Sequence, residues 1–116
     1  MMNNNVESFE SGSVFNTATE LVNTIEADEA LEAALSDMES SNSNLNRAFF
    51  KSVDSAGCMK IYGLVKEYAN SMKILKESYP GGNWHNMDAK KQYEKAQDHC
   101  YSERSRITGE ITQITG

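Results

Sequence analysis

The 116-residue sequence contains few residues that interrupt helices, with one proline and seven glycines. An all-β chain of this length would need many tight turns, where proline and glycine are the usual residues. The sequence also has no apolar run long enough to span a bilayer. It does not open with a positively charged segment followed by an apolar one, so we expect no ordinary signal peptide. These absences predict an all-α protein that does not cross a membrane.

Positive charge is missing from the first 46 residues, which contain nine acidic residues and no lysine or arginine. Residues 47–116 contain eight acidic and eleven basic residues, so the two parts carry about −9 and +3. We expect the acidic part either to lean on the basic remainder with a solvated outer face or to meet a basic partner. Nucleic acid and membranes are not expected partners, because the net charge is −6 and the cations are spread among anions.

Signatures of catalysis and metal binding are missing as well. Asp98, His99 and Cys100 are consecutive, and consecutive helical residues point about 100° apart, so they cannot converge on one atom. The two cysteines and two histidines show no C-x-x-C or H-x-x-x-H spacing, which argues against zinc. In a hairpin centred near residue 82, Cys58 and Cys100 are out of register for a disulfide. We therefore expect no enzyme activity, no cofactor, no metal and two free thiols.

The sequence does contain a turn signal at residues 79–86, which include its single proline and single tryptophan. Pro80 cannot continue a helix, and Gly81 and Gly82 both permit a positive φ, so the preceding helix should end here. Asn83, Asn86 and Asp88 are all candidate caps for the helix that follows. The indole of Trp84 should fold back over the ends of both helices or insert into a partner. The predicted turn motif comprises Pro80, Gly81, Gly82, Trp84 and Asn86.

Apolar residues on both sides of the turn recur with heptad spacing, which is typical of helices in bundles and coiled coils. We expect an antiparallel helical hairpin of about residues 56–79 and 87–114. The second helix has the weaker seam, because Glu103 occupies a seam position. The predicted interaction seam comprises Ile61, Val65, Tyr68, Met72 and Leu75 before the turn, and Tyr93, Cys100, Ile107, Ile111 and Ile114 after it.

The remainder of the chain is expected to form a tail and one acidic helix. Residues 1–16 are rich in asparagine, serine and glutamate and are predicted to be a flexible tail. A single helical domain should then cover residues 17–116. It would combine the hairpin with the N-terminal acidic helix, as a three-helix bundle or as a dimeric bundle.

The acidic helix should begin with a capping box at Thr17 and run to about Glu39. Its apolar phase slips near Asp28. The polar run at residues 40–44 is either a linker or part of one long helix. In both cases residues 45–53 are expected to be helical.

A hairpin alone would leave apolar edges such as Leu64, Ile74 and Ile111 uncovered. The acidic helix could cover them, but its phase slip and uniform charge make it an imperfect lid. We therefore expect the chain to pair with protein, as a homodimer or as a heterodimer with another helical protein.

The helix–turn–helix pattern with Trp84-His85-Asn86 at its tip resembles the small Trp-x-Gly helical-hairpin proteins of type VII secretion and their toxin-associated helical partners. Tyr93 lies near that family's later aromatic position, whereas Asn86 replaces the motif glycine. The family's secretion signal, an aromatic residue four positions before an acidic one, is not found after Tyr93 or Tyr101. The resemblance implies a subunit of a four-helix bundle, secreted without a signal peptide, or a targeting chaperone for a secreted toxin. The alternative is a cytoplasmic helical adaptor or regulator of phage or other secretion-system origin.

Overall fold

The computed structural model describes residues 17–82 and 84–116, and this part of the chain contains no strand. The all-α prediction is therefore confirmed. The predicted tail at residues 1–16 lies outside the described residues. In chain order the elements are α1 (Ala18–Glu26), α2 (Glu29–Ser41), the 3-10 helix η1 (Arg47–Ser52), α3 (Ser55–Glu77) and α4 (Met87–Thr115).

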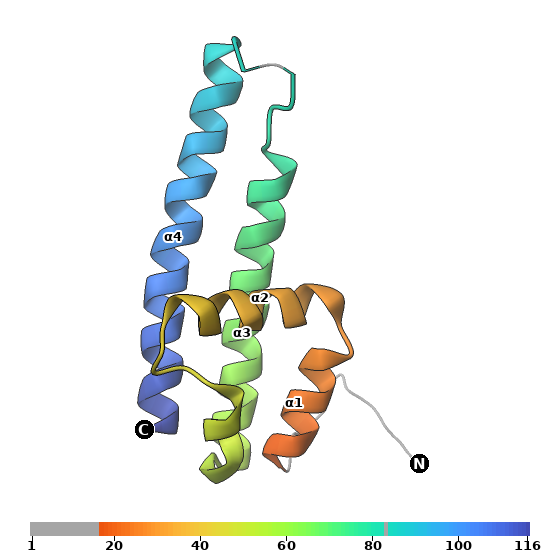
Figure 1. Cartoon of the computed structure of the whole chain (residues 1–116), viewed down its shortest axis with the longest axis vertical. Helices are drawn as coiled ribbons and strands as arrows, with labels where there is room; N and C mark the ends of the chain where they lie inside the picture. The colour runs from red at the N-terminus through yellow and green to blue at the C-terminus, as the bar shows by residue number, and fades with distance from the viewer. Residues whose placement is uncertain (1–16, 83) are drawn as a thin grey trace.

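Helices α3 and α4 form a long antiparallel hairpin (Figure 1). At 1.5 Å per residue, their 23 and 29 residues give lengths of about 34 and 43 Å. The carboxylate of Asp54 caps α3 by accepting a hydrogen bond from the Gly57 N–H at 2.8 Å. The Asn86 side chain caps α4. Between the helices Gly81 adopts a φ of 59°, which only glycine adopts without strain, so the predicted turn motif forms the turn.

The predicted single acidic helix is wrong, because the chain forms two helices there and bends between them. Thr17 and Glu20 make the predicted capping box at the start of α1. Asp28 then begins a new helix by accepting from the N–H groups of Ala30 and Leu31, at 3.0 and 3.2 Å. A straight helix would turn Ile25 and Leu31 to different faces. The bend at the phase slip allows both to be buried.

The polar run at residues 40–44 ends α2 and leads into a linker from Asn42 onward, so the alternative of one long helix is wrong. The Asn42 side chain accepts from the Asn44 N–H at 2.9 Å, and the Asn46 side chain accepts from the Ala48 N–H at 2.8 Å. Such local bonds offer the backbone an alternative to helical hydrogen bonding. The expected helix over residues 45–53 is consequently reduced to the 3-10 helix η1.

Helices α1, α2 and η1 gather over the end of the hairpin that lies far from the turn (Figure 1). Helix α1 lies beside that half of α3, while α2 crosses the hairpin near its middle. One cluster of buried side chains joins these elements to α3 and α4. Its largest fully buried members are Tyr68, Phe50, Leu21, Ile25, Leu35, Met38, Ile61, Ile107 and Ile111.

Arg47, at the start of η1, pairs with three carboxylates of the acidic segment. Its guanidinium forms ion pairs with Glu26 at 2.9 Å, Glu32 at 2.6 Å and Glu39 at 2.7 Å. These hydrogen bonds raise the pKa of Arg47, and its bond to Glu32 lowers the pKa of that carboxyl group. One side chain thus connects α1, α2 and η1. The acidic part packs on the basic remainder of the chain, which was the first of the two expectations for it.

The expectation of an imperfect lid is wrong for the covered half of the hairpin. Leu64 and Ile111 are 5% and 0% exposed, because α1 and α2 pack on α3 and η1 packs on α4 over this half of the hairpin. Ile74 lies beyond α2 and remains 42% exposed, as predicted. We call α1, α2 and η1 together the lid. The lid buries the half of the hairpin that it covers, but it does not reach the half next to the turn.

Candidate interaction surface

The hairpin extends well beyond α2, and we call this projecting part, residues 72–99, the distal hairpin (Figure 1). Among the described residues, sixteen hydrophobic side chains are buried, and none of them lies in the distal hairpin. The core therefore ends where the cover of α1 and α2 ends. Beyond that point two helices face each other alone, and two helices cannot enclose their own apolar seam.

Large apolar side chains are exposed mainly at this end of the molecule. Seven such residues are exposed in the described part of the chain, and five of them lie between residues 74 and 101. Isolated exposed apolar residues are ordinary, but a concentration of them marks an interaction site. The five residues, with their exposed fractions, are Ile74 (42%), Tyr79 (56%), Trp84 (42%), Met87 (64%) and Tyr101 (49%).

The predicted interaction seam is continuous along the hairpin, but its burial changes at α2. On α3, the members that lie under α1 and α2 are buried, whereas Met72 and Leu75 are only partly buried. On α4, Tyr93 is likewise half-buried, and Ile114 is partly buried near the other end. The buried members are Ile61, Val65, Tyr68, Cys100, Ile107 and Ile111.

Three aromatic rings pack together at the tip of the distal hairpin. Tyr79, Trp84 and Tyr93 contact one another edge to face, with ring centroids 5.5 to 5.6 Å apart and interplanar angles of 75° to 88°. The indole therefore folds back over the ends of both helices, as expected from the sequence, yet it keeps 42% of its surface exposed. Such a cluster gives the tip a rigid apolar surface.

A groove of about 650 Å³ leads from this cluster down to α2, and we call it the distal groove. Its apolar walls come from α3 and α4, and its base contains polar groups from α2 and α4. The lining residues are Asp37, Tyr68, Met72, Leu75, Lys76, Tyr79, Tyr93, Cys100, Tyr101 and Arg104.

A small polar junction fixes α2 at the base of the distal groove. The Tyr68 hydroxyl donates a hydrogen bond to the Asp37 carboxylate, which also lies 3.5 Å from the Arg104 guanidinium. Burial, followed by this hydrogen bond, raises the pKa of Tyr68, which keeps the phenol protonated as a donor. Arg104 also lies 5.1 Å from the ring centroid of Tyr101. The base of the groove is thus well defined, whereas its upper end is open.

The groups that could carry chemistry are dispersed. Asp98 and His99 are exposed, whereas Cys100 is buried, so the three side chains diverge as predicted. Cys58 and Cys100 are both free, and burial raises the pKa of each thiol, which disfavours the reactive thiolate. Among the described residues, no three His, Cys, Asp or Glu side chains gather in a way that could hold a metal ion.

Sequence reasoning missed the polar residues that place α2. Asp37 and Arg104 are 67 positions apart, and neither belongs to a motif or to an apolar stripe. Arg47 carried one usable signal, because it is the first basic residue after a long acidic segment.

Comparison with protein-family models, curated proteins and solved structures found no match to the chain. No helix in the described ranges has both the length and the apolar character that crossing a bilayer requires.

Proposed function

We propose that this chain is a non-enzymatic, partner-binding helical protein whose distal hairpin packs against helices of another protein chain. One observation carries the proposal: the apolar seam continues past α2, but its burial does not. Met72, Leu75 and Tyr79 extend the line that is fully buried at Ile61 and Tyr68. The apolar seam of the far half of the hairpin thus lacks the cover that buries the same seam in the near half.

A helical partner suits this surface best. The distal groove runs along two antiparallel helices, and adding one or two helices to such a pair completes a bundle with an enclosed core. The aromatic cluster of Tyr79, Trp84 and Tyr93 would provide a preformed anchor at one end, since it already packs against itself. A homodimer and a heterodimer both satisfy this geometry.

The resemblance to the Trp-x-Gly proteins supplies one biological setting, as a type VII secretion subunit or as a targeting chaperone for a secreted toxin. It is supported by the position of Trp84 in the turn before α4 and by the contact of Tyr93 with its ring. The alternative setting is a cytoplasmic adaptor or regulator of phage or other secretion-system origin. Both settings use the same surface, and they differ in which protein occupies it.

Site-specific photo-crosslinking in the cells that produce the protein tests the proposal. A benzophenone amino acid replaces Leu75 in the distal groove, and in a matched control it replaces exposed Gln113 at the other end of the hairpin. We expect a discrete crosslinked protein from position 75 and none from position 113. Mass spectrometry of the product then separates the two settings, because a toxin or type VII component supports the first. Equal crosslinking at both positions, or none at position 75, would count against the proposed surface.

A further inference from the structure

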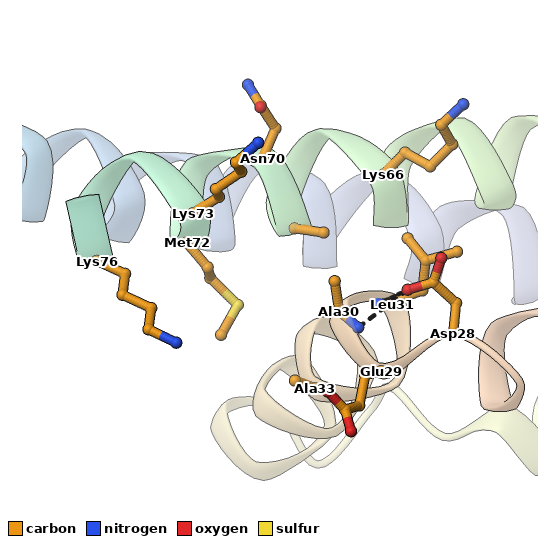
Figure 2. Close-up of a pocket in the computed structure, with 11 residues that line it drawn as sticks. Asp28, Glu29, Ala30, Leu31, Ala33, Lys66, Asn70, Met72, Lys73 and Lys76 are labelled. Atoms are coloured by element: carbon orange, nitrogen blue, oxygen red, sulfur yellow. Dashed lines mark hydrogen bonds between the residues drawn. The ribbon is translucent and has the colours of Figure 1, made fainter.

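A second groove lies on the other side of Met72, in the angle between α2 and α3 (Figure 2). It has a volume of about 1080 Å³, and we call it the α2–α3 groove. Its apolar surface comes from Leu31 and Met72 and from the small side chains of Ala30, Ala33 and Ala69. Small residues at these positions leave room for the side chains of another element.

Three lysines line the α3 wall of this groove, at positions 66, 73 and 76. Within the described residues there are seven ion pairs, and every one of them uses an arginine. Lys73 and Lys76 therefore have no carboxylate partner there. Lys66 lies 5.2 Å from the ring centroid of Tyr62, and it too has no ion pair in this part of the chain.

The opposite wall has a different charge. Asp28 and Glu29 line the groove at the start of α2, and the Asp28 carboxylate already caps that helix. A ligand that carries negative charge would be repelled by this wall and attracted by the lysine wall. The groove is therefore selective for the orientation of its ligand as well as for its charge.

We propose that the α2–α3 groove binds an acidic amphipathic helix from a partner protein. Lys66 and Lys73 are two helical turns apart, or about 10.5 Å, which matches acidic residues spaced i and i+7 on a docked helix. The apolar face of that helix would lie over Leu31, Met72 and the alanines. This site is separate from the distal groove, although Met72 and Lys76 border both.

A second copy of the chain fits the groove less well. The carboxylates of Glu26, Glu32 and Glu39 are engaged by Arg47, and the apolar face of α2 is buried in the core. Nucleic acid is disfavoured because the groove has no aromatic side chain for stacking and includes Glu29. A membrane surface is flat, whereas this apolar surface lies in an angle between two helices (Figure 2).

A pair of synthetic helical peptides of about 18 residues, each with a leucine stripe, tests the proposal. One peptide carries glutamates flanking the stripe at i and i+7, and its twin carries lysines at the same positions. Fluorescence anisotropy with the full chain should show binding of the glutamate peptide and at least about tenfold weaker binding of its twin. The double variant Lys66→Glu/Lys73→Glu should lose about tenfold in affinity for the glutamate peptide. The matched control Lys90→Glu/Lys91→Glu, on α4, should keep it.

Circular dichroism of both double variants ensures that a loss of binding reflects charge and not unfolding. Leu75→Glu alters the distal groove and should leave the affinity for the peptide unchanged. A failure of peptide binding therefore counts against the α2–α3 groove and not against the proposed role of the distal hairpin. Equal affinity for both peptides, no binding of either, or equal losses in the two double variants would overturn the proposal. So would lysine-dependent self-association, which would assign the groove to a second copy, or lysine-dependent binding to phosphatidylserine vesicles, which would assign it to a membrane.

Discussion

Two leucines on one face of α3 should differ strongly in what they contribute to stability. Leu64 and Leu75 are eleven residues apart, close to three full turns, so they point in similar directions. Leu64 is 5% exposed beneath the lid, whereas Leu75 is partly buried in the distal hairpin. The substitutions Leu64→Ala and Leu75→Ala therefore remove the same atoms from two different environments.

The magnitude follows from the atoms removed. Truncating a buried leucine to alanine loses about 2.4 kcal/mol of transfer free energy, plus a cavity term, so we expect about 3 kcal/mol for Leu64→Ala. Leu75 loses roughly half the transfer term, and water can fill the space, which gives about 1 kcal/mol. At about 4 °C per kcal/mol, the melting temperatures should fall by about 12 °C and about 4 °C.

Urea unfolding of both variants, followed by circular dichroism at the helical minimum, measures the two losses. Similar losses would refute the account, because they would mean that the distal hairpin is as well packed as the covered half. Addition of a bound partner should raise the cost of Leu75→Ala and leave that of Leu64→Ala nearly unchanged.

Three further predictions concern the lid and the turn. Arg47→Met should cost about 1–2 kcal/mol of unfolding free energy, and Arg106→Met should cost clearly less. Each arginine contacts three glutamates, but only Arg47 connects three elements, and Arg106 lies at the exposed surface; equal losses in urea would contradict this. Because the folded pKa of Glu32 lies below 4.5, its stabilisation is present above that pH and is lost as the pH falls through the folded pKa. Glu32→Gln should therefore flatten the acid limb of stability measured between pH 7 and 3, and an unchanged limb would count against the ion pair. Gly81→Ala should cost about 1 kcal/mol in thermal melts because of its positive φ, whereas Gly82→Ala should be nearly neutral; the reverse order would contradict the turn geometry.

The hairpin could be predicted from sequence because its signals are local. Pro80 and the two glycines after it mark the turn, Asn86 is one of three candidate caps for the next helix, and heptad spacing marks the faces that meet. Each of these depends on residues within a few positions of one another, so no knowledge of the tertiary structure is needed.

The lid could not be predicted in the same way. The break in apolar periodicity at Asp28 was visible in the sequence. Such a break is compatible with a poorly packed straight helix or with a bend between two helices. Only the position of α3 decides between them. The contacts that fix the bend join Arg47 to Glu26 and Glu32, 21 and 15 positions away. Which half of the hairpin stays uncovered depends on where α2 crosses it, and the residues that meet at that crossing, such as Asp37 and Arg104, are far apart in the sequence.

The mass of the assembly in solution tests the central claim most directly. The chain, purified under mild conditions from the cells that produce it, is measured by gel filtration with light scattering. We predict a complex well above the 12.9 kDa monomer, which Leu75→Glu reduces to the monomer mass while Lys91→Glu does not. A wild-type chain that elutes as a 12.9 kDa monomer would contradict the proposal that the distal hairpin is covered by a helical partner.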